Sequence, residues 1–243
     1  MKFNSFILFM ILICSCSSDN ESFDISPQNN LSLTQEAMQK TELHPASNTL
    51  NPYDYSGQLF DNLFTDYYAS SSLPTSTAHI VARVNAVAES NSQFLTLKTV
   101  AYTPTTTAEV NASLANSIGC VEAFTNAANL SVKAKSTLAD FINTVVPLCA
   151  SATEYQTVYD YIITFESATL ADAILTFTDK KVILTTSSIT RYSTYRQRKK
   201  PKKKEDPEWD LITTHVTAGA AGSEFDVCVA TSRALATGVA GQN

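Results

Sequence analysis

Residues 151–177 read SATEYQTVYDYIITFESATLADAILTF, and this stretch decides the fold class. Its apolar residues recur three and four positions apart, which is the spacing of one face of an α-helix. The face consists of Tyr155, Val158, Tyr159, Ile162, Phe165, Leu170, Ile174 and Phe177. The pattern predicts either one helix over about 152–178 or two helices with a break near Ser167. A Ser-x-x-Glu capping box from Ser151 to Glu154 is expected to begin it.

The same periodicity continues on the N-terminal side of this stretch. Helices are accordingly predicted over 37–43, 57–69, 77–97, 106–128 and 138–146. Capping boxes at Ser32 and Thr106 are expected to begin the first and the fourth of these helices. Pro147 is expected to stop the last one, because proline cannot donate a backbone hydrogen bond.

On the C-terminal side, residues 181–189 (KVILTTSSI) are rich in β-branched residues, which suits a strand. No partner strand is evident elsewhere, so we predict a helix from the context. Residues 209–241 are expected to form a helix of small residues, broken near Gly219 to Gly222. The sequence therefore predicts an all-α bundle of about six or seven helices, in a single domain over 31–243.

The N-terminus has the pattern of a lipoprotein leader. Lys2 precedes a continuous apolar run, FILFMILI over 6–13, which is too short to span a membrane. The run ends in Ile13-Cys14-Ser15-Cys16, which places a small residue immediately before a cysteine. This predicts a signal peptide over 1–15, a lipid on Cys16 that holds the chain on a membrane, and a flexible tether over 16–30. The alternative is an ordinary cleaved signal peptide with incidental cysteines.

Two stretches resemble known lipoproteins. The serine and acidic cluster Ser17-Ser18-Asp19-Asn20-Glu21 resembles the export tag of surface lipoproteins of the Bacteroidota. This resemblance implies an outer-membrane location and exposure at the cell surface. The alternative is an anchor that faces the periplasm and carries an acidic tether.

A second resemblance spans about 51–222. The turn Asn51-Pro52-Tyr53-Asp54 with Gly57, the run from Lys180 to Ser193 and the glycine-rich tail after Asp210 resemble a lipoprotein family of the Bacteroidota. In that family an aromatic pair is expected after the Arg-Tyr-Ser stretch, whereas here Tyr195 is followed by Arg196. The resemblance implies a location in the cell envelope and carries no activity or catalytic residue.

Charge excludes one class of partner and suggests another. The chain has 17 basic and 23 acidic residues, and Lys2 is the only charge in the leader, so the mature chain carries −7. General attraction to nucleic acid is therefore not expected. A cluster of basic residues that includes Arg191 leads into a loop predicted over 196–206, which is either a solvated loop or a contact for an anionic surface or an acidic envelope protein. The candidate contact residues are Asn51, Tyr53, Asp54, Arg196, Arg198, Lys199, Lys200, Lys202, Lys203 and Lys204.

Few residues suggest a catalytic, redox or metal-binding role. Cys120 and Cys149 are a candidate disulfide in an oxidising envelope, and no cysteine or histidine spacing indicates a metal site or a cofactor. His79 is the candidate general base of a hydrolase, with the helical carboxylates at 154, 160, 166 and 172 expected on a solvated face. The first hypothesis is a non-enzymatic, lipid-anchored envelope protein that binds a partner. The alternatives are an envelope hydrolase and a purely structural lipoprotein.

Overall fold

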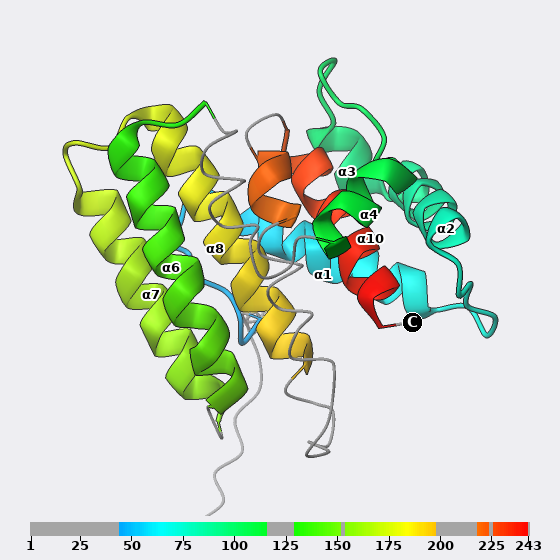
Figure 1. The fold of residues 1–243 in the computed structure, drawn as a ribbon, viewed down its shortest axis with the longest axis horizontal. Coiled ribbons are helices and arrows are strands. Elements are labelled where there is room, and N and C mark those ends of the chain that lie inside the picture. The colour runs from blue at the N-terminus through cyan, green and yellow to red at the C-terminus, as the bar shows by residue number, and fades with distance from the viewer. Residues whose placement is uncertain (1–43, 116–128, 152–153, 198–217, 224–225, 243) are drawn as a thin grey trace, which may run out of the picture. The chain divides into compact units, whose positions relative to one another are not determined.

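The computed structural model describes residues 44–115, 129–151, 154–197, 218–223 and 226–242. The chain divides between Thr41 and Glu42 into two units, and all described residues belong to the second unit. Within the described residues every regular element is a helix, which confirms the predicted all-α fold (Figure 1). The helices are α1 Asp54–Tyr68, α2 Thr77–Ser90, α3 Ser92–Leu97, α4 Thr107–Ala115, α6 Val132–Ser151, α7 Tyr155–Ala171, α8 Phe177–Gln197 and α10 Val227–Gly241, with a short helical segment at 218–223.

The helices form two groups that share α8. On one side α6 and α7 pack against α8, and on the other α1 to α4 pack around α10 (Figure 1). The α1 helix has its largest contact with α8 and also contacts α10, so it joins the two groups. Two apolar cores result, and α8 contributes to both, with Ile189 and Tyr192 in one and Val182 and Ile183 in the other.

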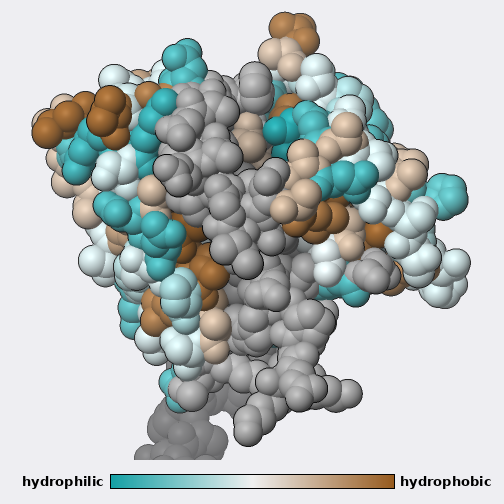
Figure 2. All heavy atoms as spheres, in the orientation of Figure 1, coloured by the Kyte–Doolittle hydropathy of each residue, from teal (hydrophilic) through white to brown (hydrophobic). Residues whose placement is uncertain are grey.

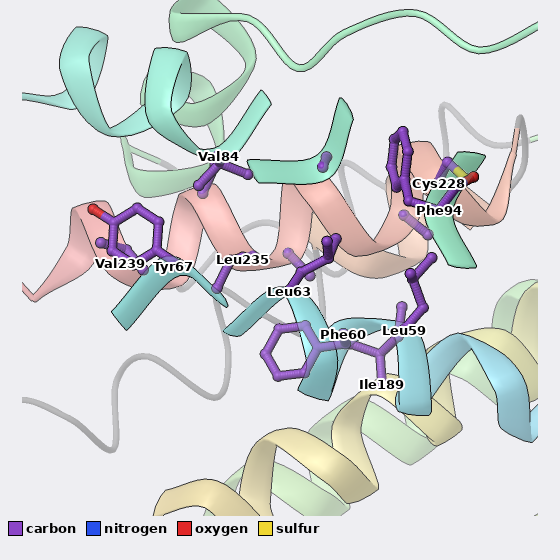
Figure 3. Packing of buried hydrophobic residues seen from close by; sticks show 14 of the residues in the cluster. Leu59, Phe60, Leu63, Tyr67, Val84, Phe94, Ile189, Cys228, Leu235 and Val239 are labelled. Carbon is purple, nitrogen blue, oxygen red and sulfur yellow. The ribbon is translucent and has the colours of Figure 1, made fainter. Parts of the chain in front are cut away.

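The core around α10 is built from one apolar face of α1. Figure 3 shows this face lying against α10. The buried side chains that meet there include Leu59, Phe60, Leu63, Tyr67, Leu235 and Val239. The small residues of α10 allow the neighbouring helices to approach closely, because alanine, serine and glycine occupy little volume. This core fixes the direction of α1 and therefore the position of the residues at its N-terminal end.

The ambiguous stretch 181–189 is helical and lies inside α8, as predicted. Every residue from Val182 to Tyr195 is buried, including its hydroxyl-bearing residues. These residues are tolerated because several hydroxyls donate to the carbonyl four residues earlier, as Thr186 does to Val182 at 2.8 Å and Thr190 does to Thr186 at 2.8 Å. A helix enclosed on all sides has no polar face, which explains why its periodicity was ambiguous.

Several predicted boundaries are wrong. Helix α1 begins at Asp54, three residues before the predicted start at 57. The predicted helix over 77–97 is broken at Asn91, whose side chain accepts a hydrogen bond from the Phe94 backbone at 3.0 Å and caps α3. Helix α4 ends at Ala115 in the described part of the chain, and residues 116–128 lie outside it, as do 37–43 and 209–217.

The stretch 151–177 contains one whole helix, α7, which runs through Ser167 without a break and ends at Ala171, and α8 begins at Phe177, so neither predicted alternative has the right bounds. The capping box predicted at Ser151 is also wrong, because Ser151 is the last residue of α6 and its hydroxyl donates to the Leu148 carbonyl. A reciprocal capping box instead begins α8, where Thr176 and Asp179 exchange hydrogen bonds at 3.0 and 3.1 Å. The box predicted between Thr106 and Glu109 is confirmed.

Pro147 does not stop α6, which continues to Ser151. The proline side chain is exposed, so its ring faces solvent while Val145 and Cys149 on either side are buried. Packing of this last turn against α7 and α8 outweighs the missing backbone hydrogen bond, which explains why the sequence rule fails here.

Candidate functional site

The turn predicted as a contact surface has its two ends buried. Asn51 is 2% exposed and Asp54 is buried, whereas Pro52 is exposed and Tyr53 is half-buried. The Asn51 side chain accepts from the Tyr53 backbone at 2.8 Å, which fixes the turn, and donates to Glu166 Oε1 at 2.8 Å and to the Leu184 carbonyl at 3.0 Å. The prediction of Asn51 and Asp54 as surface contacts is therefore wrong, because both side chains point into the helix junction.

Arg191 lies at the centre of this junction and is fully buried. Its Nη2 donates to Asp54 Oδ1 at 2.7 Å and to Glu166 Oε1 at 3.3 Å, and its Nη1 donates to the Ala46 carbonyl. Burial alone lowers the pKa of Arg191, but the carboxylates of Glu166 and Asp54 outweigh it, so that the pKa is raised. The guanidinium is therefore a permanent buried cation between two acids.

Glu166 was expected on a solvated helix face, and this prediction is wrong because the side chain is fully buried. Its carboxylate accepts from Asn48 Nδ2 at 2.6 Å and from Ser187 Oγ at 2.8 Å, in addition to Asn51 and Arg191. The sequence held one signal for this position, since Glu166 follows Val158 and Ile162 at steps of four along the buried stripe of α7.

The carboxylate of Asp54 also accepts several hydrogen bonds. It accepts from the Ser47 hydroxyl at 3.0 Å, the Asn48 backbone at 3.1 Å and Gln58 Nε2 at 3.1 Å. The Tyr192 hydroxyl also donates to it at 3.3 Å, and burial raises the pKa of Tyr192 to about 12. We refer to Asn48, Asn51, Asp54, Glu166, Ser187, Arg191 and Tyr192 together as the Arg191 network.

The Arg191 network is suited to holding helices together rather than to catalysis. Both carboxylates accept several hydrogen bonds, and the side chains that donate them come from residues 47–58 and from α8. A general acid or base needs access to a substrate and a proton that it can exchange. The network offers neither, because its charged atoms are buried and already paired.

Arg196 was predicted to begin a basic loop, but it lies in the last turn of α8. Its Nη2 donates to Asp61 Oδ2 at 2.6 Å, so its charge is paired with α1. His44 lies beside the same carboxylate, with Nε2 at 3.7 Å from Asp61 Oδ2, and its ring stacks on Tyr192 at 4.9 Å. The prediction of a loop from residue 196 is therefore wrong at its first two positions, because α8 extends to Gln197.

The rest of the basic run divides between two situations. Arg191 belongs to the buried network and is not available to a surface partner. Arg198, Lys199, Lys200, Lys202, Lys203 and Lys204 lie outside the described residues, so their role as contacts stays a prediction.

His79 is exposed on the first turn of α2. Its Nδ1 is 3.0 Å from the hydroxyl of Ser76, which is the N-cap residue of the same helix. Helix α2 packs on α1, α3, α4 and α10, whereas α7 packs on α6 and α8. The structure therefore does not unite His79 with the carboxylates of α7, and the Ser76 contact is explained by helix capping.

An open groove of about 280 Å³ lies along α6 and α7. Its base is aromatic, with the Phe141 ring 4.4 Å from Phe165 and 6.1 Å from Tyr161, measured between ring centroids. Charged residues border it, including Asp140 and the ion pair between Lys133 and Asp172 at 3.8 Å. Threonine hydroxyls complete the lining, and burial raises the pKa of Tyr161. Such a mixture of ring faces and hydrogen-bonding groups suits binding of a ligand.

The predicted pairing of Cys120 with Cys149 stays a prediction, and in the structure Cys149 is a free thiol packed in the core of α6, α7 and α8. Burial raises the pKa of Cys149 to about 12. Cys120 itself lies outside the described residues. Among the residues that the structure describes, no cluster of histidine, cysteine and carboxylate side chains could hold a metal ion. None of the described helices is long and apolar enough to cross a membrane.

Comparisons with protein-family models, with curated proteins and with solved structures find no match to this chain. The residues and their geometry are therefore the basis for any statement of function.

Proposed function

We propose that this chain is a non-enzymatic, lipid-anchored protein of the bacterial cell envelope, which binds an envelope component. The observation that carries the location is the leader, in which an apolar run ends in Ile13-Cys14-Ser15-Cys16. The thiol of Cys16 would take the lipid after cleavage. The cluster from Ser17 to Glu21 supports the outer membrane and the cell surface through its resemblance to an export tag.

The groove along α6 and α7 supports a binding role. Its lining combines the Tyr161 and Phe165 rings with Asp140 and the Lys133–Asp172 pair. Ring faces pack against apolar surfaces, while the carboxylates and threonine hydroxyls accept or donate hydrogen bonds. A sugar segment of an envelope polymer has both features, and we propose this chemical class as the ligand.

The lipid anchor is tested in cells that carry the full chain. Metabolic labelling with an alkyne fatty acid should mark the protein, and membrane fractions should contain it. The Cys16→Ala variant should lose the label and leave the membrane fraction, because the thiol proposed to take the lipid is absent. A Cys14→Ala variant is the matched control and should keep both. Equal labelling of the Cys16→Ala variant would exclude the proposed anchor.

The binding role is tested by placing a photo-cross-linking residue at Thr144, which is exposed at the groove. Asn111 is the matched control, because it is exposed on α4 in the other helix group. Irradiation of intact cells should give carbohydrate-containing adducts at position 144 only. The same adducts at both positions, or none at either, would contradict the groove as a binding site.

A further inference from the structure

Three large apolar side chains project from one end of the α6–α7–α8 group. Val132 is 86% exposed, Ile174 is 74% exposed and Phe177 is 77% exposed. They belong to the first turn of α6, the α7–α8 connection and the first residue of α8. Figure 2 shows strongly hydrophobic surface at this end of the helix group. We refer to these three residues as the apolar tip.

Hydrogen bonds hold the apolar tip in place. Asp179 accepts from the Ser131 backbone at 3.0 Å and from the Thr176 backbone at 3.0 Å, which ties the start of α6 to the start of α8. The Ile174 backbone donates to Asp172 Oδ1 at 2.8 Å. Leu175 beneath is 6% exposed and anchors the connection in the core. The three side chains are therefore exposed by a well-defined scaffold, since their backbone is tied on both sides.

Cationic residues border the apolar tip. Lys133, Lys135, Lys180 and Lys181 lie in the first turns of α6 and α8. The acids of the same region are Asp172, which pairs with Lys133, and the buried Asp179. Four lysines against two aspartates make this end locally positive, although the whole chain carries −6. An apolar centre with a cationic border is complementary to a bilayer that carries phosphate headgroups.

We propose that the apolar tip docks on the surface of a phospholipid bilayer. Val132, Ile174 and Phe177 enter the boundary below the headgroups, and the lysines lie at the level of the phosphates. The proposal rests on the proposed function, because the lipid on Cys16 brings the protein to the membrane. His44 is 28 residues after Cys16, and a chain of that length spans at most roughly 100 Å when extended. Tethering makes a contact of three side chains effective, because the second binding event becomes intramolecular.

The test uses the full anchored chain reconstituted in vesicles that contain phosphatidylglycerol and bromine-labelled phospholipids. Trp209 is replaced by phenylalanine, so that one introduced tryptophan reports alone. The Ile174→Trp variant places it at the apolar tip, and the Val100→Trp variant is the control, because Val100 is fully exposed in the α3–α4 connection. Quenching of the Ile174→Trp variant should exceed the control by about threefold or more, because interfacial groups lie roughly 5–10 Å into the boundary.

The contribution of the lysines around the apolar tip is tested in the same vesicles. A Lys133→Gln and Lys181→Gln double substitution should reduce quenching of the Ile174→Trp variant, whereas Lys98→Gln, on a surface of the other helix group, should not. If the chain is not recovered with the vesicles, the proposed anchor fails. If it is recovered and both tryptophan variants are quenched equally, the anchor stands and docking of the tip is excluded. If the tryptophan at position 174 instead becomes shielded from water as the protein density in the vesicles rises, without bromine quenching, the tip contacts a second copy of the chain. That result would overturn the proposal.

Discussion

The guanidinium of Arg191 donates to the carboxylate of Asp54 across 2.7 Å, and the two side chains are 0% and 9% exposed. A second ion pair of the same length joins Lys98 to Glu89 at 2.7 Å, but its side chains are 33% and 43% exposed. The two pairs have equal distances and differ in burial. They therefore allow the effect of burial on an ion pair to be measured within one protein.

Removal of the buried cation should be far more destabilising than removal of the exposed one. Arg191→Met leaves Asp54 and Glu166 as uncompensated buried acids, which should cost roughly 3–5 kcal/mol of unfolding free energy. Lys98→Met should cost only about 0–1 kcal/mol, because solvent screens the exposed pair. Urea unfolding near neutral pH measures both. Similar losses in the two variants would show that the Arg191 network does not hold the helix junction.

Gly57 lies where α1 crosses α8 and has no room for a side chain. A Cβ atom there would be 2.2 Å from Tyr192 Cδ2 and 2.7 Å from the Ser188 carbonyl oxygen. Gly57→Ala should therefore lower the unfolding free energy by about 1–3 kcal/mol or more, because the helices must separate. Gly219→Ala is the control, since its nearest atom would be 3.5 Å away and helix propensity favours alanine by up to about 1 kcal/mol. Equal melting temperatures would contradict the close approach.

Pro147→Ala should stabilise the protein. The exposed proline lies inside α6 and leaves the carbonyl four residues earlier without its helical donor. Alanine restores the donor and gains up to about 3 kcal/mol in helix propensity, and the greater freedom of the unfolded chain offsets about 0.4–1 kcal/mol of this. A rise in melting temperature checks the prediction. A fall would indicate that the proline ring itself supports the last turn of α6.

The carboxylate of Asp179 should make the stability of the protein depend on pH. Burial alone would raise its pKa, but hydrogen bonds from Ser131 and Thr176 outweigh burial and lower the pKa below 3.8. A carboxyl group with a depressed pKa contributes stability above the unfolded value and loses it as pH falls. The Asp179→Asn variant should therefore be less stable than the parent near neutrality, and the difference should shrink below about pH 4. Urea midpoints at several pH values test this, and a constant difference would contradict it.

Cys149 should be unreactive in the folded protein. Its thiol is buried, and burial raises its pKa to about 12, so almost no thiolate exists near neutral pH. Iodoacetamide treatment followed by peptide mapping should find Cys149 unmodified in native protein and modified in urea without a reductant. Modification in urea only after reduction would indicate a disulfide at this position.

The helices were predictable wherever one face is apolar and the other is exposed. Helices α1 and α2 follow this pattern, and their periodicity identified them with small errors at the ends. Helix α8 is buried around its whole circumference, so neither its type nor its bounds could be derived from periodicity. Pro147 shows the opposite error, in which a reliable local rule is overridden by tertiary packing.

The candidate site was less predictable because it depends on distant partners. Glu166 occupies a buried position in the stripe of α7, but nothing local indicates that Arg191, 25 residues later, neutralises it. The interpretation of Asn51 and Asp54 as surface contacts failed for the same reason, since Glu166 and Arg191, which bind them in the helix junction, lie more than 100 residues away. The groove forms only because α6 packs against α7. The periodicity of a single helix does not specify which other helix it packs against.

The first described residues have a mechanical consequence. His44 is the first residue that the structure describes, and within the next ten residues Ala46, Asn48, Asn51 and Asp54 bind Glu166 or Arg191. A pull on this end of the described chain would therefore load α7 and α8 together before it could unwind α1. Arg191 and Glu166 would spread that force across the helix junction, so the fold should resist unravelling from this end.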